Sequence, residues 1–112
     1  MMPELPNSED VVITGLTIRG YQGMLNDWAE ANGFKWSKKE VDTMLLRIIS
    51  EAIEGSEAVR DENWKLFAEE MADIFIRLVN CCEVMGIDLQ NEVHKKHQKN
   101  LKRPFLHGRK NK

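Results

Sequence analysis

Apolar residues recur along most of the chain at the spacing of an α-helix. In the stretch 16–32 they occupy positions i, i+3, i+4 and i+7 of one helical face, namely Tyr21, Met24, Leu25 and Trp28. Thr14 or Thr17 can cap the start of this helix, and Gly33 can end it. The pattern therefore predicts a first helix over residues 16–32 whose core face holds these four side chains.

A capping box marks the start of a second helix. Ser37 and Glu40 stand three residues apart, so each side chain can satisfy a free backbone amide of the other residue. Gly55 is expected to end this helix. The positions of its predicted core stripe are Val41, Met44, Leu45, Ile48 and Ala52.

The third predicted helix, residues 61–86, is apolar on more than one face. Its main stripe comprises Trp64, Phe67, Met71, Ile74, Phe75, Leu78, Cys82 and Met85. Between Ile74 and Val79 only Arg77 is polar. Because such a helix is buried from more than one side, the pattern predicts an oligomer in which a partner subunit covers Ile74, Ile76 and Val79.

A fourth helix is predicted from Asp88, which can serve as its N-cap, to about Arg103, where Pro104 stops it. No stretch alternates in the manner of a β-strand. The expected fold class is therefore all-α, a small bundle of four to five helices that forms an oligomer through the third helix.

Charge is divided unevenly along the chain. Residues 1–93 contain all 18 acidic residues, whereas residues 94–112 contain no acid and 8 of the 16 Lys and Arg. An acidic body with a basic end can bind a metal ion at one end and phosphates at the other. We expect one domain, residues 14–107, between an N-terminal extension (1–13) and a basic tail (108–112).

Neither a membrane protein nor a secreted one is predicted. No apolar run approaches the roughly 18–20 residues of a membrane helix, and the first residues lack the regions of a signal peptide. Cys81 and Cys82 are adjacent among apolar residues, so they are interpreted as core thiols. The protein is expected to be cytoplasmic.

Two pairs of carboxylates stand three residues apart on the second and third helices: Glu51 with Glu54, and Glu70 with Asp73. Residues i and i+3 are neighbours on a helix, so four carboxylates meet if the two helices pack side by side. Such a cluster repels itself unless a cation binds it, and Mg²⁺ prefers oxygen ligands. The alternative interpretation is a set of solvated surface acids.

Other side chains are candidates for contacts with a substrate. Lys96, Asn100 and Arg103 share one face of the fourth helix, where they suit phosphate oxygens, although a solvated basic face is the alternative. Trp36 lies in the loop before the second helix, where it could stack on a base, although core packing is the default for tryptophan.

These residues together resemble the signature of the MazG-like nucleotide pyrophosphohydrolases, which belong to the all-α NTP pyrophosphatase superfamily. Residues 50–54 (Ser-Glu-Ala-Ile-Glu) and 70–73 (Glu-Met-Ala-Asp) resemble its Glu-Glu-x-x-Glu and Glu-x-x-Asp motifs. Residues 86–89 look like the family's turn between its third and fourth core helices, and residues 96–105 resemble its Lys-x-x-x-Asn-x-x-Arg ending. The resemblance covers about residues 16–107.

The resemblance implies a dimeric or tetrameric enzyme that needs Mg²⁺, with Mn²⁺ as a substitute. Such enzymes hydrolyse nucleoside triphosphates, often deoxy ones, to the monophosphate and pyrophosphate, in nucleotide housecleaning or pool control. By position, the metal ligands would be Glu51, Glu54, Glu70 and Asp73, and the phosphate-binding residues would be Lys96, Asn100 and Arg103. The catalytic role of taking a proton from the attacking water would belong to Glu54, assisted by Glu51.

Ser50 is the one clear departure, because the family has its first Glu there. It leaves open the number of metal ions and keeps a second interpretation alive: a catalytically weakened helical interaction module that binds a partner protein or nucleic acid. Within the enzyme class, phosphoribosyl-ATP hydrolysis is a related activity. For the enzyme no membrane or nucleic-acid partner is expected, and base preference and the choice between dimer and tetramer stay open.

Overall fold

Four α-helices make up the computed structural model, which describes residues 16–104. They are α1 (Ile18–Ala31), α2 (Val41–Arg60), α3 (Trp64–Val84) and α4 (Leu89–Leu101), with a 3₁₀ turn, η1 (Lys38–Glu40), before α2. No strand occurs within this range, so the all-α expectation is confirmed. The predicted N-terminal extension and basic tail lie outside the described residues. None of these helices is long and apolar enough to cross a bilayer.

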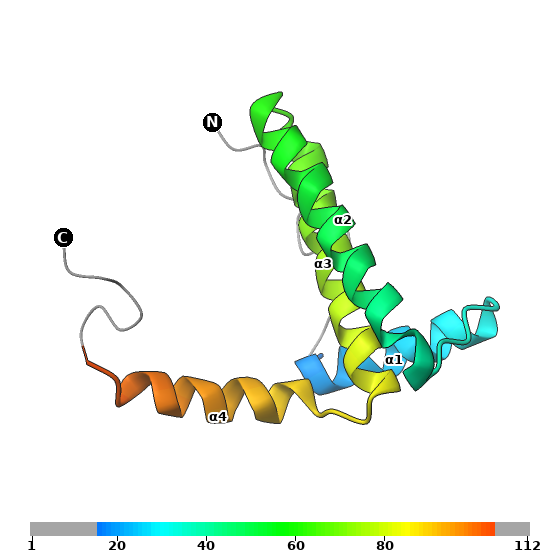
Figure 1. The fold of residues 1–112 in the computed structure, drawn as a ribbon, viewed down its shortest axis with the longest axis vertical. Coiled ribbons are helices and arrows are strands. Elements are labelled where there is room, and N and C mark those ends of the chain that lie inside the picture. Colours follow the sequence, from blue (N-terminus) through cyan, green and yellow to red (C-terminus); the bar gives the residue numbers. More distant parts are fainter. Residues whose placement is uncertain (1–15, 105–112) are drawn as a thin grey trace.

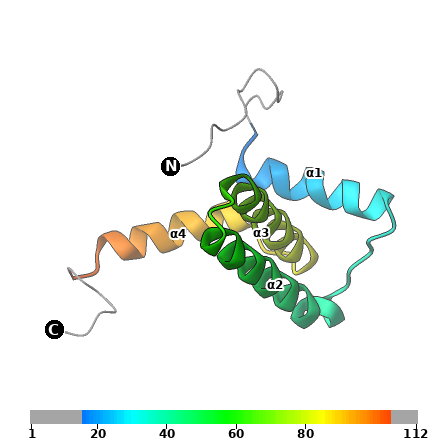
Figure 2. The ribbon, with the colours of Figure 1, turned by 90° about the horizontal axis from the view of Figure 1, so that it is seen from above.

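The two longest helices, α2 and α3, form an antiparallel hairpin (Figure 1). α1 packs across one end of this hairpin, against α3 (Figure 2). α4 touches α1 and then projects away from the hairpin, as both views show. α3 is therefore the centre of the fold, and the long α2–α3 contact is where side chains of both helices meet.

Local signals set the helix starts as expected. The Thr17 hydroxyl accepts a hydrogen bond from the Gly20 amide at 3.0 Å, and the Asp88 carboxylate accepts one from the Asn91 amide at 3.1 Å. The capping box is present, since Glu40 accepts a bond from the Ser37 amide at 3.0 Å. Each cap satisfies an amide that has no partner within its helix.

The prediction that Gly55 ends the second helix is wrong, because α2 continues to Arg60. Gly55 is buried against α3, where an added Cβ would lie 3.1 Å from Met71 Cε and 3.7 Å from Glu70 Cβ. The missing side chain lets α3 approach α2 closely at Gly55, one helical turn after Glu51. The glycine is thus a contact residue of the hairpin rather than a stop signal.

The core face of α1 also differs from the prediction. Met24 and Trp28 are exposed, and the buried positions are Gln22 and Ala29. Gln22 is fully buried because its amide has partners: its nitrogen donates to the Ile87 carbonyl and to Glu83, and its oxygen accepts from the Leu89 amide. A polar side chain therefore fixes α1 to the turn between α3 and α4.

The core stripe of α2 is shifted in a similar way. Met44 is buried as expected, but Leu45 and Ala52 are exposed. Three apolar residues of α2 that stand three to four positions apart, Leu46, Ile49 and Ile53, are 60%, 53% and 57% exposed. We call these three residues the α2 strip. An apolar strip of this kind is typical of an association surface.

On α3, Val79 is completely buried within its own chain, whereas Ile76 stays exposed. Val79 therefore needs no partner subunit to cover it, contrary to the expectation. The predicted core stripe of this helix divides likewise, because Met71 and Leu78 are exposed while Cys82 is buried. Association through the third helix stays a prediction, and the α2 strip offers more exposed apolar surface.

Candidate functional site

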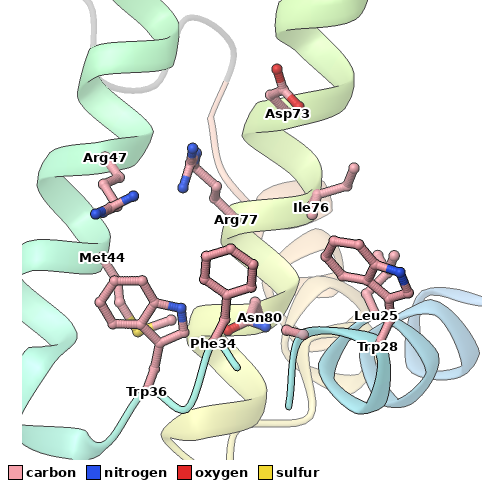
Figure 3. Close-up of a pocket in the computed structure, with 11 residues that line it drawn as sticks. Leu25, Trp28, Phe34, Trp36, Met44, Arg47, Asp73, Ile76, Arg77 and Asn80 are labelled. Carbon is pink, nitrogen blue, oxygen red and sulfur yellow. The ribbon is translucent and has the colours of Figure 1, made fainter. Parts of the chain in front are cut away.

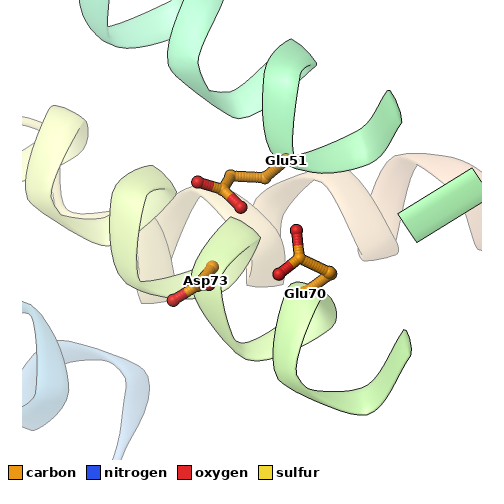
Figure 4. A group of neighbouring side chains, drawn as sticks. All are labelled: Glu51, Glu70 and Asp73. Carbon is orange, nitrogen blue, oxygen red and sulfur yellow. The ribbon is translucent and has the colours of Figure 1, made fainter. Parts of the chain in front are cut away.

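Three acidic side chains meet where α2 packs on α3. Oxygen atoms of Glu51, from α2, and of Glu70 and Asp73, from α3, all lie within 4.8 Å of one another (Figure 4). Glu51 and Glu70 are only 9% and 7% exposed. The sequence predicted carboxylates at this helix contact, and the fold brings these three together in what we call the acidic cluster.

Glu54, the fourth predicted ligand, lies at the edge of the acidic cluster. It is exposed and is not one of the three residues grouped within 4.8 Å. It is nevertheless near enough that its charge helps to raise the pKa of Glu70. Ser50, one residue before Glu51, is exposed on α2.

Arg77 is a member of the site that the sequence analysis missed. Its Nε donates a hydrogen bond to Glu51 Oε1 at 3.0 Å, forming an ion pair between α3 and α2. The available signal was its position four residues after Asp73, which places both side chains on one face of α3. In the sequence alone, Arg77 is only the polar exception within an apolar segment.

Burial and like charge perturb the acidic cluster. The pKa of Glu70 is raised to about 7, first by burial and then by the neighbouring carboxylates of Glu51 and Glu54. Burial also raises the pKa of Glu51, but the adjacent Glu70 carboxyl and the Arg77 guanidinium stabilise its charged form and outweigh burial, so the net shift is downward. Glu70 Oε2 is buried and has no hydrogen-bond partner among residues 16–104. A proton on Glu70, or a cation bound between the carboxylates, would each relieve the repulsion within the cluster.

The raised pKa of Glu70 has a consequence for stability without metal. Between about pH 4.5 and 7 the folded protein keeps a proton on Glu70 that the unfolded chain releases. Folding then binds a proton, so this group makes the free energy of unfolding fall as the pH rises through about 7. Glu51, whose pKa is lowered, acts in the opposite sense and loses its contribution on acidification below its ordinary pKa.

We expect urea denaturation in the presence of EDTA to show this fall for wild-type protein, and Glu70→Gln to remove it. Glu69→Gln, which changes the exposed neighbour on α3, is the control and should keep the wild-type pH dependence. Identical pH profiles of wild type and Glu70→Gln would contradict the assigned pKa shift.

An aromatic pocket of about 340 Å³ adjoins the acidic cluster (Figure 3). Its lining residues are Leu25, Trp28, Ala29, Phe34, Trp36, Met44, Arg47, Asp73, Ile76, Arg77 and Asn80. The rings of Trp28 and Phe34 are nearly parallel, with centroids 6.3 Å apart, and the Arg47 guanidinium lies 5.0 Å from the centroid of Trp36. Trp36, the base-stacking candidate, is thus a wall of this pocket.

Asp73 and Arg77 belong both to the pocket wall and to the neighbourhood of the acidic cluster. The aromatic pocket and the carboxylate oxygens of the acidic cluster therefore lie next to each other, with Asp73 and Arg77 between them. This arrangement can hold a ligand that is planar at one end and anionic at the other, provided that a cation joins the carboxylates.

The predicted phosphate-binding residues lie elsewhere in the chain. Lys96 and Asn100 are exposed on α4, and Arg103 is exposed two residues beyond the end of that helix. Because α4 projects away from the hairpin (Figure 1), the fold of one chain does not bring these side chains to the acidic cluster.

A family model of the MazG nucleotide pyrophosphohydrolase domain matches residues 39–105. The match spans more than half of the chain and includes α2, α3 and α4, and therefore every residue of the acidic cluster. No curated protein and no solved structure matched the chain.

Proposed function

Because the chain belongs to the MazG nucleotide pyrophosphohydrolase family, we propose that it hydrolyses nucleoside triphosphates, deoxy ones by preference, to the monophosphate and pyrophosphate. The observation that carries the proposal is the boundary shared by the acidic cluster and the aromatic pocket at Asp73 and Arg77. A nucleoside triphosphate needs both features together, an apolar surface for its base and a cation site for its phosphates.

The acidic cluster suits Mg²⁺ chemically, or Mn²⁺ in its place. Its donors are carboxylate oxygens from two helices, and Glu70 Oε2 is a buried acceptor without a partner in the part of the chain that the structure describes. Glu51, Glu70 and Asp73 would hold the ion, with Glu54 completing the set from the edge. When bound, the ion would neutralise phosphate charge and make water more acidic. Ser50 contributes no charge, so the set is less acidic than the family signature.

The chain's own residues would do the remaining work. Glu54 is exposed enough to meet a water molecule, and as the proposed general base it accepts the proton when that water attacks the α-phosphorus. Arg77 lies between the carboxylates and the pocket, where its guanidinium can contact phosphate oxygens. Trp28 and Trp36 would position the base, which keeps the reacting phosphate beside the cluster.

The basic residues of α4 would complete this site in a second copy of the chain. Lys96 and Asn100 are solvent-exposed on the projecting helix α4, and Arg103 is exposed just beyond its end. The α2 strip offers an apolar surface for association. An oligomer in which α4 of one subunit covers the acidic cluster of its partner would bring these cations and amide to the substrate phosphates.

We expect light scattering to give at least twice the chain mass of 13.0 kDa at micromolar concentration. Ile49→Asp should dissociate the oligomer, because association would bury an unpaired charge. Thr43→Asp, at an exposed polar position of the same helix, is the control and should leave the mass unchanged. Dissociation by Ile76→Asp alone would place the contact on α3 instead, and a wild-type mass near 13.0 kDa would refute the oligomer.

The decisive assay is pyrophosphate release from each canonical ribo- and deoxynucleoside triphosphate, with Mg²⁺, with Mn²⁺ and with EDTA. Metal-dependent formation of monophosphate and pyrophosphate in equal amounts supports the proposal. Absence of turnover on every substrate, together with strongly salt-dependent binding of nucleic acid, would instead support the helical interaction module.

A further inference from the structure

A buried carboxamide on α3 has no partner within the described part of the chain. Asn80 is 8% exposed, and its Oδ1 is one of two buried side-chain oxygens there that lack a hydrogen bond, the other being Glu70 Oε2. Buried polar atoms in folded proteins nearly always have partners, so an orphaned acceptor requires an explanation. Asn80 also lines the aromatic pocket, which suggests that the missing donor comes from a ligand there.

The position of Asn80 along α3 gives it a defined place in the site. Asp73, Arg77 and Asn80 stand at i, i+4 and i+7, so they follow one another along one face of the helix (Figure 3). Seven residues of α-helix span roughly 10 Å. The order from the acidic cluster outward is therefore carboxylate, guanidinium and carboxamide, ending among aromatic rings.

The walls around Asn80 limit what the ligand can be. Trp28, Phe34 and Trp36 provide flat apolar surface, and the cavity of about 340 Å³ is at the size of a small-molecule site. A planar ring that lies between such walls presents its edge, not its face, to the helix behind it. The acceptor on Asn80 would then meet an N–H group on the edge of a planar heterocycle.

We propose that Asn80 is a specificity-determining residue that reads the hydrogen-bonding edge of the nucleobase. Its Oδ1 accepts a hydrogen bond from a ring N–H or an exocyclic amino group, while its Nδ2 can donate to the neighbouring acceptor of the same edge. The assignment rests on the proposed function, in which the aromatic pocket takes the base and the acidic cluster takes the phosphates. Asn80 therefore affects which base binds, and it has no part in the hydrolytic step.

The test measures binding of the four deoxynucleoside monophosphates without metal, by tryptophan fluorescence and calorimetry, so no turnover is needed. We expect wild-type affinities to differ among the four bases by about tenfold, the effect of one good hydrogen bond to a buried partner. Asn80→Leu, which is similar in size and apolar, should reduce the differences to within about threefold. Asn91→Leu, at an exposed position of α4, is the matched control and should keep the wild-type order.

Asn80→Ser is a second variant in case the leucine variant does not fold. It should also lose base discrimination, because serine has one hydroxyl and cannot offer a donor and an acceptor on two adjacent atoms. Equal wild-type affinities for the four monophosphates, or an unchanged order in both variants, would overturn the assignment. If light scattering shows that the Asn80 variants have a changed mass while their base discrimination is unchanged, the assignment is also overturned, because Asn80 would then be a subunit contact. If the Asn80 variants still discriminate among the bases while the wild-type protein shows metal-dependent hydrolysis, only the role assigned to Asn80 is rejected. If the variants lose base discrimination but the wild-type protein hydrolyses no triphosphate, only the proposed reaction is rejected.

Discussion

Replacing Glu70 or Asp73 with alanine is expected to lower kcat for triphosphate hydrolysis by at least about 100-fold while the helical fold persists. Both side chains belong to the acidic cluster, and Glu70 carries the orphaned buried oxygen. Removing one carboxylate relieves like-charge repulsion in the metal-free protein, so stability should not fall. Glu69→Ala, one residue away and exposed, is the matched control and should retain activity.

Thermal melts with and without Mg²⁺ separate loss of metal binding from loss of chemistry. A ligand that binds only the folded state raises its stability, so the wild-type melting temperature should rise with Mg²⁺ and the Glu69→Ala value should rise equally. The Glu70→Ala and Asp73→Ala variants should gain little. Equal Mg²⁺ stabilisation of all four proteins would mean that the ion does not bind at the acidic cluster.

Features that depend on a few neighbouring residues could be predicted from the sequence. The caps at Thr17, Ser37 and Asp88 are local hydrogen bonds between a side chain and an amide three residues away, so residue type and spacing suffice to find them. The pairing of the Glu51 and Glu70 segments followed from helical periodicity, which sets the faces of α2 and α3.

Features that depend on the partner element could not be predicted in this way. Gly55 resembles a helix stop until α3 is seen to pack on it. Gln22 resembles a surface residue until its amide is seen to donate a hydrogen bond to the Ile87 carbonyl. Arg77 and Asn80 gain their meaning in the same manner, from a carboxylate on α2 and from a pocket built by the loop after α1. Single-chain periodicity holds no information about these contacts.

The position of α4 relative to the acidic cluster also depends on a partner, in this case a second subunit. The resemblance assigns Arg103 to the substrate phosphates, yet α4 projects away from α2 and α3 within one chain (Figure 1). If the assignment holds, Arg103 acts on the site of a partner subunit. The activity of one subunit would then depend on Arg103 of its partner, which would not be so if Arg103 were only a solvated charge near the end of a helix.

Arg103→Ala is expected to lower kcat/KM by roughly 10- to 150-fold, the loss of one charge-assisted hydrogen bond. Arg103→Lys should also lower it, because lysine lacks the planar fork that contacts two phosphate oxygens. The gain in melting temperature with Mg²⁺ should stay at the wild-type value, since the carboxylates are untouched. Truncation after His107, beyond the described residues, should have a smaller effect, and a larger one would assign the phosphate contacts to the tail.

Coexpression of Arg103→Ala with Glu70→Ala tests whether Arg103 acts between subunits. In a mixed dimer, the intact carboxylates of the first variant would meet the intact Arg103 of the second, so one site of two is complete. Random pairing should then restore roughly a quarter of wild-type kcat/KM, which is about 2.5- to 40-fold above the value expected for Arg103→Ala alone. If Arg103 served its own chain, every site would carry one defect and the mixture would not exceed the activity of Arg103→Ala alone. Recovery by mixing therefore requires α4 to cross from one subunit to the acidic cluster of the other.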